Sequence, residues 1–327
     1  MKTEPLLRWT KKDLIGIREL SRSEIEIILD LTPKFLSVSE RASGIKKVPL
    51  LQGRLVVNWF HEPSTRTRTS FELAAKRLSA DILSITASSL STVKGETLHD
   101  TLANIEAMNT DILVLRHSGA GVPHILAKDH ASHIINAGDG RHEHPTQALL
   151  DAFTMREEMR RLYNDPNRGL DGIKVALVGD IQHSRVARSN IHALTKLGAD
   201  VTVCGPATLL PRGIEGFGVK VTTDLGEALE NVDVIYALRI QMERQGKALF
   251  PSVGEYVRLF RIDRDALCYA PDHAIVMHPG PINRDLELST EVADGPRSVI
   301  LKQVTNGVAV RMAVMHVLAN AGSSKEL

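Results

Sequence analysis

The sequence predicts an α/β protein with two domains, each a parallel β-sheet flanked by helices, and an active site in the cleft between them. The length of 327 residues suggests two domains, because a domain usually takes about 150 residues. Short β-rich runs alternate with helical periodicity in both halves, which is typical of βαβ units and parallel sheets. Polar or glycine-rich segments follow most of these runs, and open parallel sheets bind ligands beyond the carboxyl ends of their strands.

The first half is expected to contain a sheet whose strands alternate with helices. Apolar residues at i, i+3, i+4 and i+7 indicate one of the helices, through Phe71, Ala74, Ala75 and Leu78. The expected strands are residues 55–60, 82–86, 111–115 and 133–136.

The second half repeats this pattern after a break near residues 163–172, where Pro166 and two glycines indicate turns. The expected strands are residues 174–178, 201–204, 219–222, 233–238 and 274–277. A helix at roughly 145–162 bridges the two sheets, and a last helix from Thr305 to Asn320 can return to the first domain. We therefore predict one domain from residues 1–150 together with about 304–327, and a second from residues 151–303.

Composition excludes several other classes of protein. Forty Lys and Arg stand against 39 Asp and Glu, and this near-balance argues against a nucleic-acid-binding protein. Two cysteines, Cys204 and Cys268, cannot build a disulfide framework or a Cys-rich zinc site. No apolar run approaches the ~20 residues that span a bilayer, and the polar N-terminus lacks the apolar segment of a signal peptide. We expect a cytoplasmic protein with neither nucleic-acid nor membrane partners.

The strongest local signal is the segment Ser64-Thr65-Arg66-Thr67-Arg68 between an expected strand and an expected helix. Unpaired N–H groups and the dipole at a helix N-terminus favour an anion there. Hydroxyls add donors, and a guanidinium suits phosphate. The alternative interpretation is an ordinary N-cap followed by a solvated basic turn.

His144 and Gln147 follow another expected strand and lie three residues apart, so both side chains share one face of a helix. The alternative for His144 is a capping or core histidine before Pro145. The neighbouring His142-Glu143-His144 is weak support for zinc, and we expect no metal site.

Four segments resemble the aspartate and ornithine carbamoyltransferases, and the resemblance covers nearly the whole chain. Residues 60–71 resemble the carbamoyl phosphate signature of that family, and residues 94–97 resemble its mobile loop. Residues 144–151 resemble the second signature, and residues 239–244 resemble a motif of the aspartate branch. The His-Cys-Leu-Pro segment of the ornithine enzymes is not present, which favours the aspartate branch.

The resemblance implies a carbamoyl phosphate-binding first domain, an aspartate-binding second domain, and transfer of the carbamoyl group to L-aspartate. The products are N-carbamoyl-L-aspartate and phosphate, in the committed step of pyrimidine synthesis. Neither a cofactor nor a metal is implied. The residues carried over as catalytic are Arg66, Lys94, Arg116 and His144.

The same resemblance assigns the binding residues. Phosphate is held by Ser64, Thr65, Arg66, Thr67 and Arg116, whereas the carbamoyl group meets His144, Gln147 and the carbonyls of Gly280 and Pro281. Aspartate is held by Lys94, Arg185, Arg239 and Gln241. Arg284 is interpreted as a stabiliser of a closed form.

In this family the loop that carries Lys94 comes from a neighbouring subunit, which implies a homotrimer with shared active sites. The loop serine is either Ser89 or Ser91, and we favour Ser91 because it lies three residues before Lys94. Larger assemblies with separate regulatory or dihydroorotase chains are left open by the sequence.

Three other functions fit the sequence less well than an aspartate-branch carbamoyltransferase. A dinucleotide-binding dehydrogenase is disfavoured, because the segment after residue 178 keeps Gly179 alone of the three fingerprint glycines. A non-catalytic homologue would not need the full set of arginines and His144. A carbamoyltransferase with ornithine or a related amine as acceptor is disfavoured by Arg185 and Arg239, which suit a dicarboxylate and repel a second ammonium group.

Overall fold

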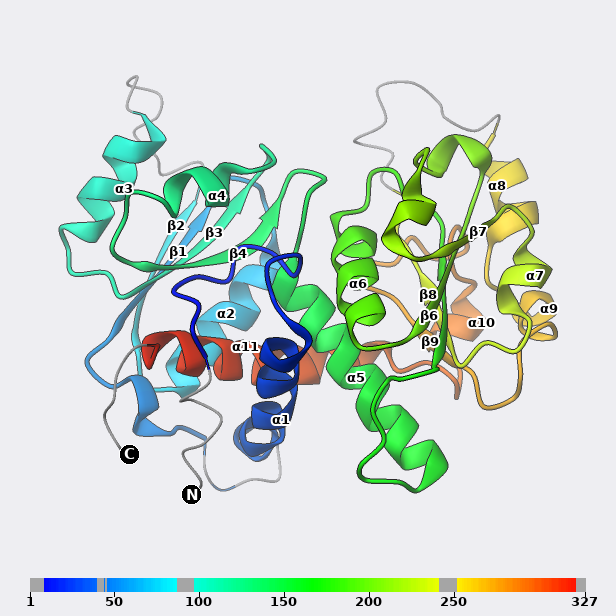
Figure 1. The fold of residues 1–327 in the computed structure, drawn as a ribbon, viewed down its shortest axis with the longest axis horizontal. Coiled ribbons are helices and arrows are strands. Elements are labelled where there is room, and N and C mark those ends of the chain that lie inside the picture. Colours follow the sequence, from blue (N-terminus) through cyan, green and yellow to red (C-terminus); the bar gives the residue numbers. More distant parts are fainter. Residues whose placement is uncertain (1–8, 40–43, 45, 87–96, 241–251, 322–327) are drawn as a thin grey trace. The chain divides into compact units, whose positions relative to one another are not determined.

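The computed structural model describes residues 9–39, 44, 46–86, 97–240 and 252–321. The chain divides into two compact units (Figure 1). Unit 1 comprises residues 1–150 and 305–327, and unit 2 comprises residues 151–304.

Unit 1 contains a four-stranded sheet in the order β2-β1-β3-β4, and every neighbouring pair is parallel. The strands are β1 (Leu55–Phe60), β2 (Asp81–Thr86), β3 (Ile112–His117) and β4 (His133–Asp139). Its helical elements are α1 (Arg22–Ser39), η2 (Pro49–Leu51), α2 (Thr65–Arg77), α3 (Leu98–Glu106) and α4 (Val122–Leu126). The expected parallel sheet is thereby confirmed, although the sequence analysis did not assign α1.

The unit 1 sheet is covered on both faces, with α3 and α4 on one side and α2 on the other (Figure 1). Trp59 and Leu115 pack on the α3 side with Leu102 and Ile105. On α2, the predicted apolar stripe buries Phe71, Ala74 and Ala75, so its helical period matches the structure. A central parallel strand needs apolar residues on both faces, and β1 is buried from Val56 to Phe60.

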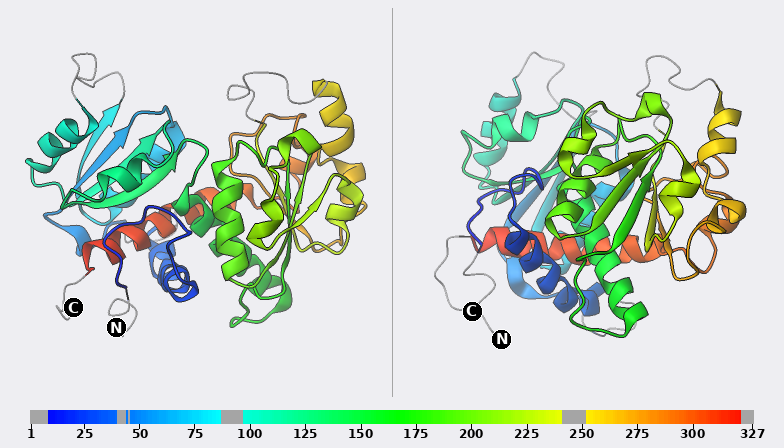
Figure 2. Two further views of the ribbon diagram at one scale, coloured as in Figure 1. Left: turned by 45° about the horizontal axis from the view of Figure 1, so that its top comes forward. Right: turned by 45° about the vertical axis from the view of Figure 1, so that its right-hand side comes forward.

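Unit 2 contains a five-stranded parallel sheet in the order β7-β6-β5-β8-β9, seen obliquely in Figure 2. The strands are β5 (Lys174–Val178), β6 (Asp200–Cys204), β7 (Lys220–Thr222), β8 (Val234–Ala237) and β9 (Ile275–Met277). The helical elements are α6 (Arg185–Lys196), η5 (Ala207–Leu209), η6 (Ile214–Phe217), α7 (Leu225–Leu229), α8 (Val253–Phe260), α9 (Arg264–Leu267) and α10 (Thr290–Ala293). The second predicted parallel sheet is also confirmed.

The boundaries between the units fall inside two long helices, α5 (Pro145–Tyr163) and α11 (Ile300–Ala319). In unit 2, the fully buried Asp151 of α5 accepts hydrogen bonds from Tyr236 Oη (2.6 Å), Gln303 Nε2 (2.8 Å) and Asn190 Nδ2 (2.9 Å). Removing a buried acceptor leaves its donors without a partner, at a cost of about 1–3 kcal/mol each. Asp151 thus ties α5, α6, α11 and β8 together.

The segment before α1 extends the unit 1 sheet beside β4. Leu14 forms a parallel bridge with Ile135, and its N–H donates to Ile134 O at 2.9 Å. Asp13 Oδ1 accepts the Ile134 N–H at 2.7 Å. No helix within the described ranges combines the length and apolar composition that a membrane crossing requires.

Candidate active site

In unit 1, the predicted site residues follow three adjacent strands at the same edge of the sheet. Ser64 and its neighbours follow β1, Arg116 lies near the end of β3, and His144 follows β4. Phe60 of β1 and Arg116 of β3 are register partners. Because the strands are parallel, their carboxyl ends meet at one edge of the sheet. The unit 1 residues predicted to bind the phosphate and those predicted to bind the carbamoyl group therefore lie at the same edge.

Ser64 is the N-cap of α2, but its hydroxyl makes no capping hydrogen bond. The other described helices that begin at Ser, Thr or Asp all use that side chain as a cap, at Thr97, Ser184, Asp224, Ser252, Asp263 and Ser289. The first N–H groups of α2 and the Ser64 hydroxyl are therefore not consumed by capping each other. An ordinary side-chain N-cap is wrong for Ser64, and the arrangement favours an anion.

Arg116 is 9% exposed, and its guanidinium is held at two points. Nη2 donates to Glu62 Oε1 at 2.7 Å, and Nη1 donates to Ala137 O at 3.2 Å. Glu62 was not among the residues predicted for the site, although in the sequence it is a carboxylate inside an otherwise basic motif. This carboxylate orients the guanidinium and competes with any anion that binds to it.

Two histidines beside this arginine are neutral at pH 7. The ring of His61 lies 4.9 Å, centroid to centroid, from both Trp59 and His117. Burial, reinforced by the nearby His117, lowers the pKa of His61 to about 4. Burial also lowers the pKa of His117, although Gly119 and two carboxylates oppose it. Positive charge at this edge therefore comes from the arginines.

His144 and Gln147 lie at the start of α5, where Pro145 occupies the first helical position. Their side chains are buried, at 4% and 9% exposure. The Gln147 N–H donates to His144 O at 3.0 Å, which places both residues on the first turn. The N-terminal end of a helix suits these residues for contact with a developing negative charge on a carbonyl oxygen.

In unit 2, the predicted residues follow the adjacent strands β5, β8 and β9. Arg185 is the first residue of α6 and is 4% exposed, while Arg239 follows β8 and is half-buried. Gly280 adopts φ +60°, a conformation that favours glycine, and its N–H donates to His278 Nδ1 at 2.7 Å. Pro281 is exposed. The guanidinium groups and the Gly280 turn thus share one sheet edge.

The remaining predicted residues either lie outside the described ranges or make other contacts. Ser89, Ser91, Lys94 and Gln241 lie outside the described residues. Arg284 forms an exposed ion pair with Asp294 within unit 2, at 2.7 and 2.9 Å.

Family models match both units. A model described as aspartate/ornithine carbamoyltransferase, carbamoyl-P binding domain, matches residues 12–157. A second, described as aspartate/ornithine carbamoyltransferase, Asp/Orn binding domain, matches residues 171–318. The chain belongs to the aspartate/ornithine carbamoyltransferase family, as the sequence motifs predict.

Its curated relatives include aspartate carbamoyltransferase catalytic subunits. That of Syntrophus aciditrophicus is 55% identical over 317 residues, covering 97% of this chain and 100% of the relative. That of Geotalea daltonii is 55% identical over 306 residues, covering 93% and 95%.

Solved structures of the family share the fold. Trypanosoma cruzi aspartate transcarbamoylase in complex with carbamoyl phosphate and aspartate has a TM-score of 0.83 and 30% identity, covering 97% of this chain and 99% of that one. The ornithine carbamoyltransferase of Pyrococcus furiosus has a TM-score of 0.78 and 28% identity, covering 94% and 96%.

The unused hydroxyl of Ser64 leads to a first prediction, for Ser64→Ala. We expect urea denaturation to show a free energy of unfolding within about 0.5 kcal/mol of that of the unaltered chain. The dissociation constant for inorganic phosphate, measured by calorimetry, should rise about 10-fold. The matched control is Ser252→Ala, which removes a working cap and should cost about 1 kcal/mol without altering phosphate binding. Equal stability losses in the two variants would contradict this reading of Ser64.

The lowered pKa of His61 leads to a second prediction. The folded chain keeps His61 neutral down to about pH 4, whereas the unfolded chain protonates it near 6.5. The unfolded state therefore binds more protons in this window, so stability falls as pH drops from 6.5 towards 4 and is unaffected above 6.5.

Two measurements check this. NMR titration of the His61 ring should show protonation near pH 4, and His61→Gln should weaken the pH dependence of the unfolding midpoint. A ring that titrates at the ordinary histidine pKa, with an unchanged slope in the variant, would be inconsistent with burial as the cause.

Proposed function

We propose that this protein is a transferase that moves the carbamoyl group of carbamoyl phosphate to the amine of L-aspartate. The products are N-carbamoyl-L-aspartate and phosphate, in the committed step of de novo pyrimidine biosynthesis. Two observations support this proposal, one in each unit: the start of α2 in unit 1, where Ser64 makes no capping hydrogen bond, and the buried or half-buried arginines that follow β5 and β8 in unit 2. Both substrates are anions, and the proposed binding residues of each unit include guanidinium groups.

The phosphate of carbamoyl phosphate would bind at the start of α2. Ser64, Thr65, Arg66 and Thr67 offer hydroxyls, backbone N–H groups and a guanidinium, and the helix dipole favours the negative charge. Arg116 lies on the neighbouring strand and is oriented by Glu62. In this proposal its guanidinium would contact the phosphate and the carbonyl oxygen. An anion that takes one guanidinium nitrogen would compete with the Glu62 carboxylate.

The carbamoyl group would lie against the first turn of α5. His144 donates to the carbonyl oxygen, and Gln147 accepts from the carbamoyl NH₂. Negative charge develops on that oxygen as the amine attacks, so a fixed donor stabilises the transition state more than the substrate. Losing one such donor typically costs ~10²–10³ in turnover. The carbonyls of Gly280 and Pro281 would accept hydrogen bonds from the carbamoyl NH₂ or the incoming amine.

The reaction is acyl transfer from a mixed anhydride. The aspartate nitrogen forms a bond to the carbamoyl carbon, the bond from that carbon to the phosphate oxygen breaks, and the amine proton leaves with phosphate. Arg185, Arg239, Gln241 and Lys94 would hold the aspartate carboxylates. No cofactor or metal is needed for this chemistry.

The acceptor is tested by a product assay with carbamoyl phosphate and either L-aspartate or L-ornithine, with EDTA present. We expect carbamoyl-aspartate alone, because two guanidinium groups suit a dicarboxylate and repel a second ammonium group. Arg185→Ala and Arg239→Ala should each raise the KM for aspartate about 10- to 100-fold, and Arg258→Ala, an exposed arginine of unit 2, should not.

Citrulline as the product would instead assign ornithine as the acceptor and remove the proposed roles of Arg185 and Arg239. If the folded chain forms neither product, the result would favour a homologue that has lost the activity.

We further propose that the active form is a cytoplasmic homotrimer whose sites are shared between subunits, with Ser91 and Lys94 reaching a neighbouring subunit. Support comes from β2, the edge strand that precedes the segment carrying these residues, which exposes 45% of Leu83. An exposed apolar edge strand generally needs a cover. Both cysteines are free and Cys268 is exposed, which suits a reducing compartment.

Mixing two inactive variants tests the shared site. Lys94→Ala and His144→Ala should each be inactive alone, and random mixed trimers should regain activity at about a quarter of their sites. A same-residue mixture, such as His144→Ala with differently tagged His144→Ala, is the control. Mixed trimers that form, as sedimentation and tags report, but stay inactive would place both residues in the site of one chain.

A further inference from the structure

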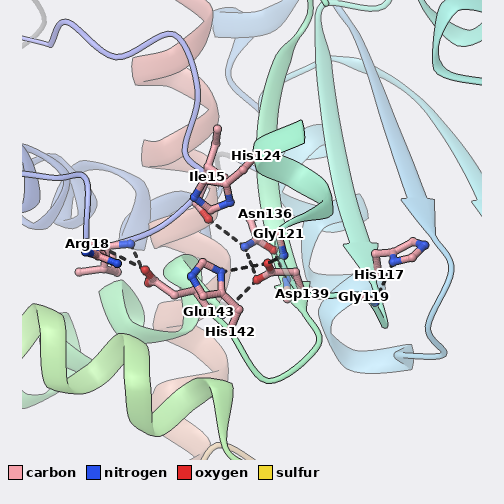
Figure 3. Close-up of polar contacts among 12 residues, drawn as sticks. Ile15, Arg18, His117, Gly119, Gly121, His124, Asn136, Asp139, His142 and Glu143 are labelled. Carbon is pink, nitrogen blue, oxygen red and sulfur yellow. Dashed lines mark hydrogen bonds and ion pairs between the residues drawn. The ribbon is translucent and has the colours of Figure 1, made fainter. Parts of the chain in front are cut away.

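Three side chains of unit 1 that the proposed reaction does not use converge beside the sheet. His124 lies on α4, and Asp139 and His142 lie at the end of β4 and in the turn that follows it (Figure 3). Each offers one ligand atom, and these atoms all lie within 4.8 Å of one another. Among the residues that the structure describes, this is the one group of three or more His, Cys, Asp or Glu that meets so closely.

Asp139 is fully buried, and its carboxylate is fixed by its surroundings. It accepts hydrogen bonds from Gly121 N (2.7 Å), Asn136 Nδ2 (2.8 Å) and Glu143 N (3.0 Å). Burial raises the pKa of Asp139, but these bonds and the one from His142 outweigh it and hold the pKa below its usual value. The group is therefore an anionic oxygen ligand at neutral pH.

His142 pairs directly with that carboxylate, because its Nδ1 lies 3.0 Å from Asp139 Oδ2. The contact brings a ring nitrogen and a carboxylate oxygen, two common metal-ligand atoms, close together. The side chain of His142 is 27% exposed, so its ring has room to turn towards an ion.

His124 completes the group, with its ring centroid 5.2 Å from that of His142. Its Nε2 pairs with Glu19 Oε1 at 3.1 Å, and its Nδ1 is buried with no hydrogen-bond partner. A buried polar atom without a partner costs free energy. A carboxylate on one ring nitrogen of a histidine commonly orients the other nitrogen towards a metal.

We propose that His124, Asp139 and His142 bind one late first-row divalent ion, of the class of Zn²⁺ or Co²⁺. Two imidazoles and one carboxylate suit these ions, whereas Mg²⁺ and Ca²⁺ prefer all-oxygen sites. Water would fill the remaining position of a tetrahedral ion. Bonds of about 2.0–2.2 Å require the ligand atoms to draw together, and the two partly exposed histidines permit this.

The ion would take the place of the hydrogen bond between His142 and Asp139. The ion would join α4 to the turn after β4. That turn is already attached to the N-terminal segment, because Glu143 accepts the N–H groups of Ile17 (2.7 Å) and Arg18 (3.2 Å). Occupancy would therefore stabilise unit 1, independently of the proposed carbamoyl transfer.

The test uses the metal ions themselves on the full chain, freed of metal by a chelator. We expect calorimetry to show one Zn²⁺ per chain, visible absorption to show Co²⁺ with nitrogen ligands, and the thermal midpoint to rise with Zn²⁺ but not with Mg²⁺. His124→Ala should lower the Zn²⁺ affinity at least 10-fold, and His142→Gln should do the same, with circular dichroism confirming the fold.

The matched control is His273→Ala, because His273 also pairs with a carboxylate, Asp233, at 3.0 Å but belongs to no such group within the described ranges. This variant should bind Zn²⁺ like the unaltered chain. The proposal is overturned if the unaltered chain binds no Zn²⁺ at 100-fold excess, or if His124→Ala and His142→Gln both bind it as the unaltered chain does.

Discussion

Parallel strand pairing is the constraint on which the site depends. In each sheet every neighbouring pair runs in the same direction, so the segments that leave the strands gather at one edge. Residues distant in sequence, such as Arg66 and His144 or Arg185 and Gly280, thereby reach a common edge of their sheet. Such a sheet has to bury both faces, which is why short apolar runs separated by helices already indicate the arrangement.

Charge at the unit 1 edge is organised by one ion pair and two neutral rings. Glu62 holds the Arg116 guanidinium at 2.7 Å, and burial keeps His61 and His117 from adding charge. The proposed anion site would therefore depend on fixed guanidinium groups and the helix N-terminus, neither of which changes charge near neutral pH. Orientation of the donors before substrate arrives is what makes them effective in a transition state.

Asp139 has a different part in the same unit. It closes the turn that leads to Glu143 and His144, through hydrogen bonds from backbone and side chains. The proposed metal group includes this carboxylate, so one buried acid supports the turn before the candidate catalytic histidine and would also bind the proposed ion. A buried carboxylate with several donors is costly to remove and geometrically well defined.

The sequence by itself determined the two parallel sheets, the helical stripe of α2 and the family, because apolar periodicity and short motifs are local properties. It also proposed the arginines and His144 as site residues, of which Arg66, Arg239 and His144 lie in such motifs. Only the tertiary structure decided that Ser64 does not cap its helix, that Glu62 holds Arg116, and that Leu14 pairs with β4. It alone brought His124 to His142, which the sequence analysis had considered only beside His144. Apart from the missing cap of Ser64, these contacts join residues distant in sequence, and their geometry follows from strand order and packing, which no local pattern records.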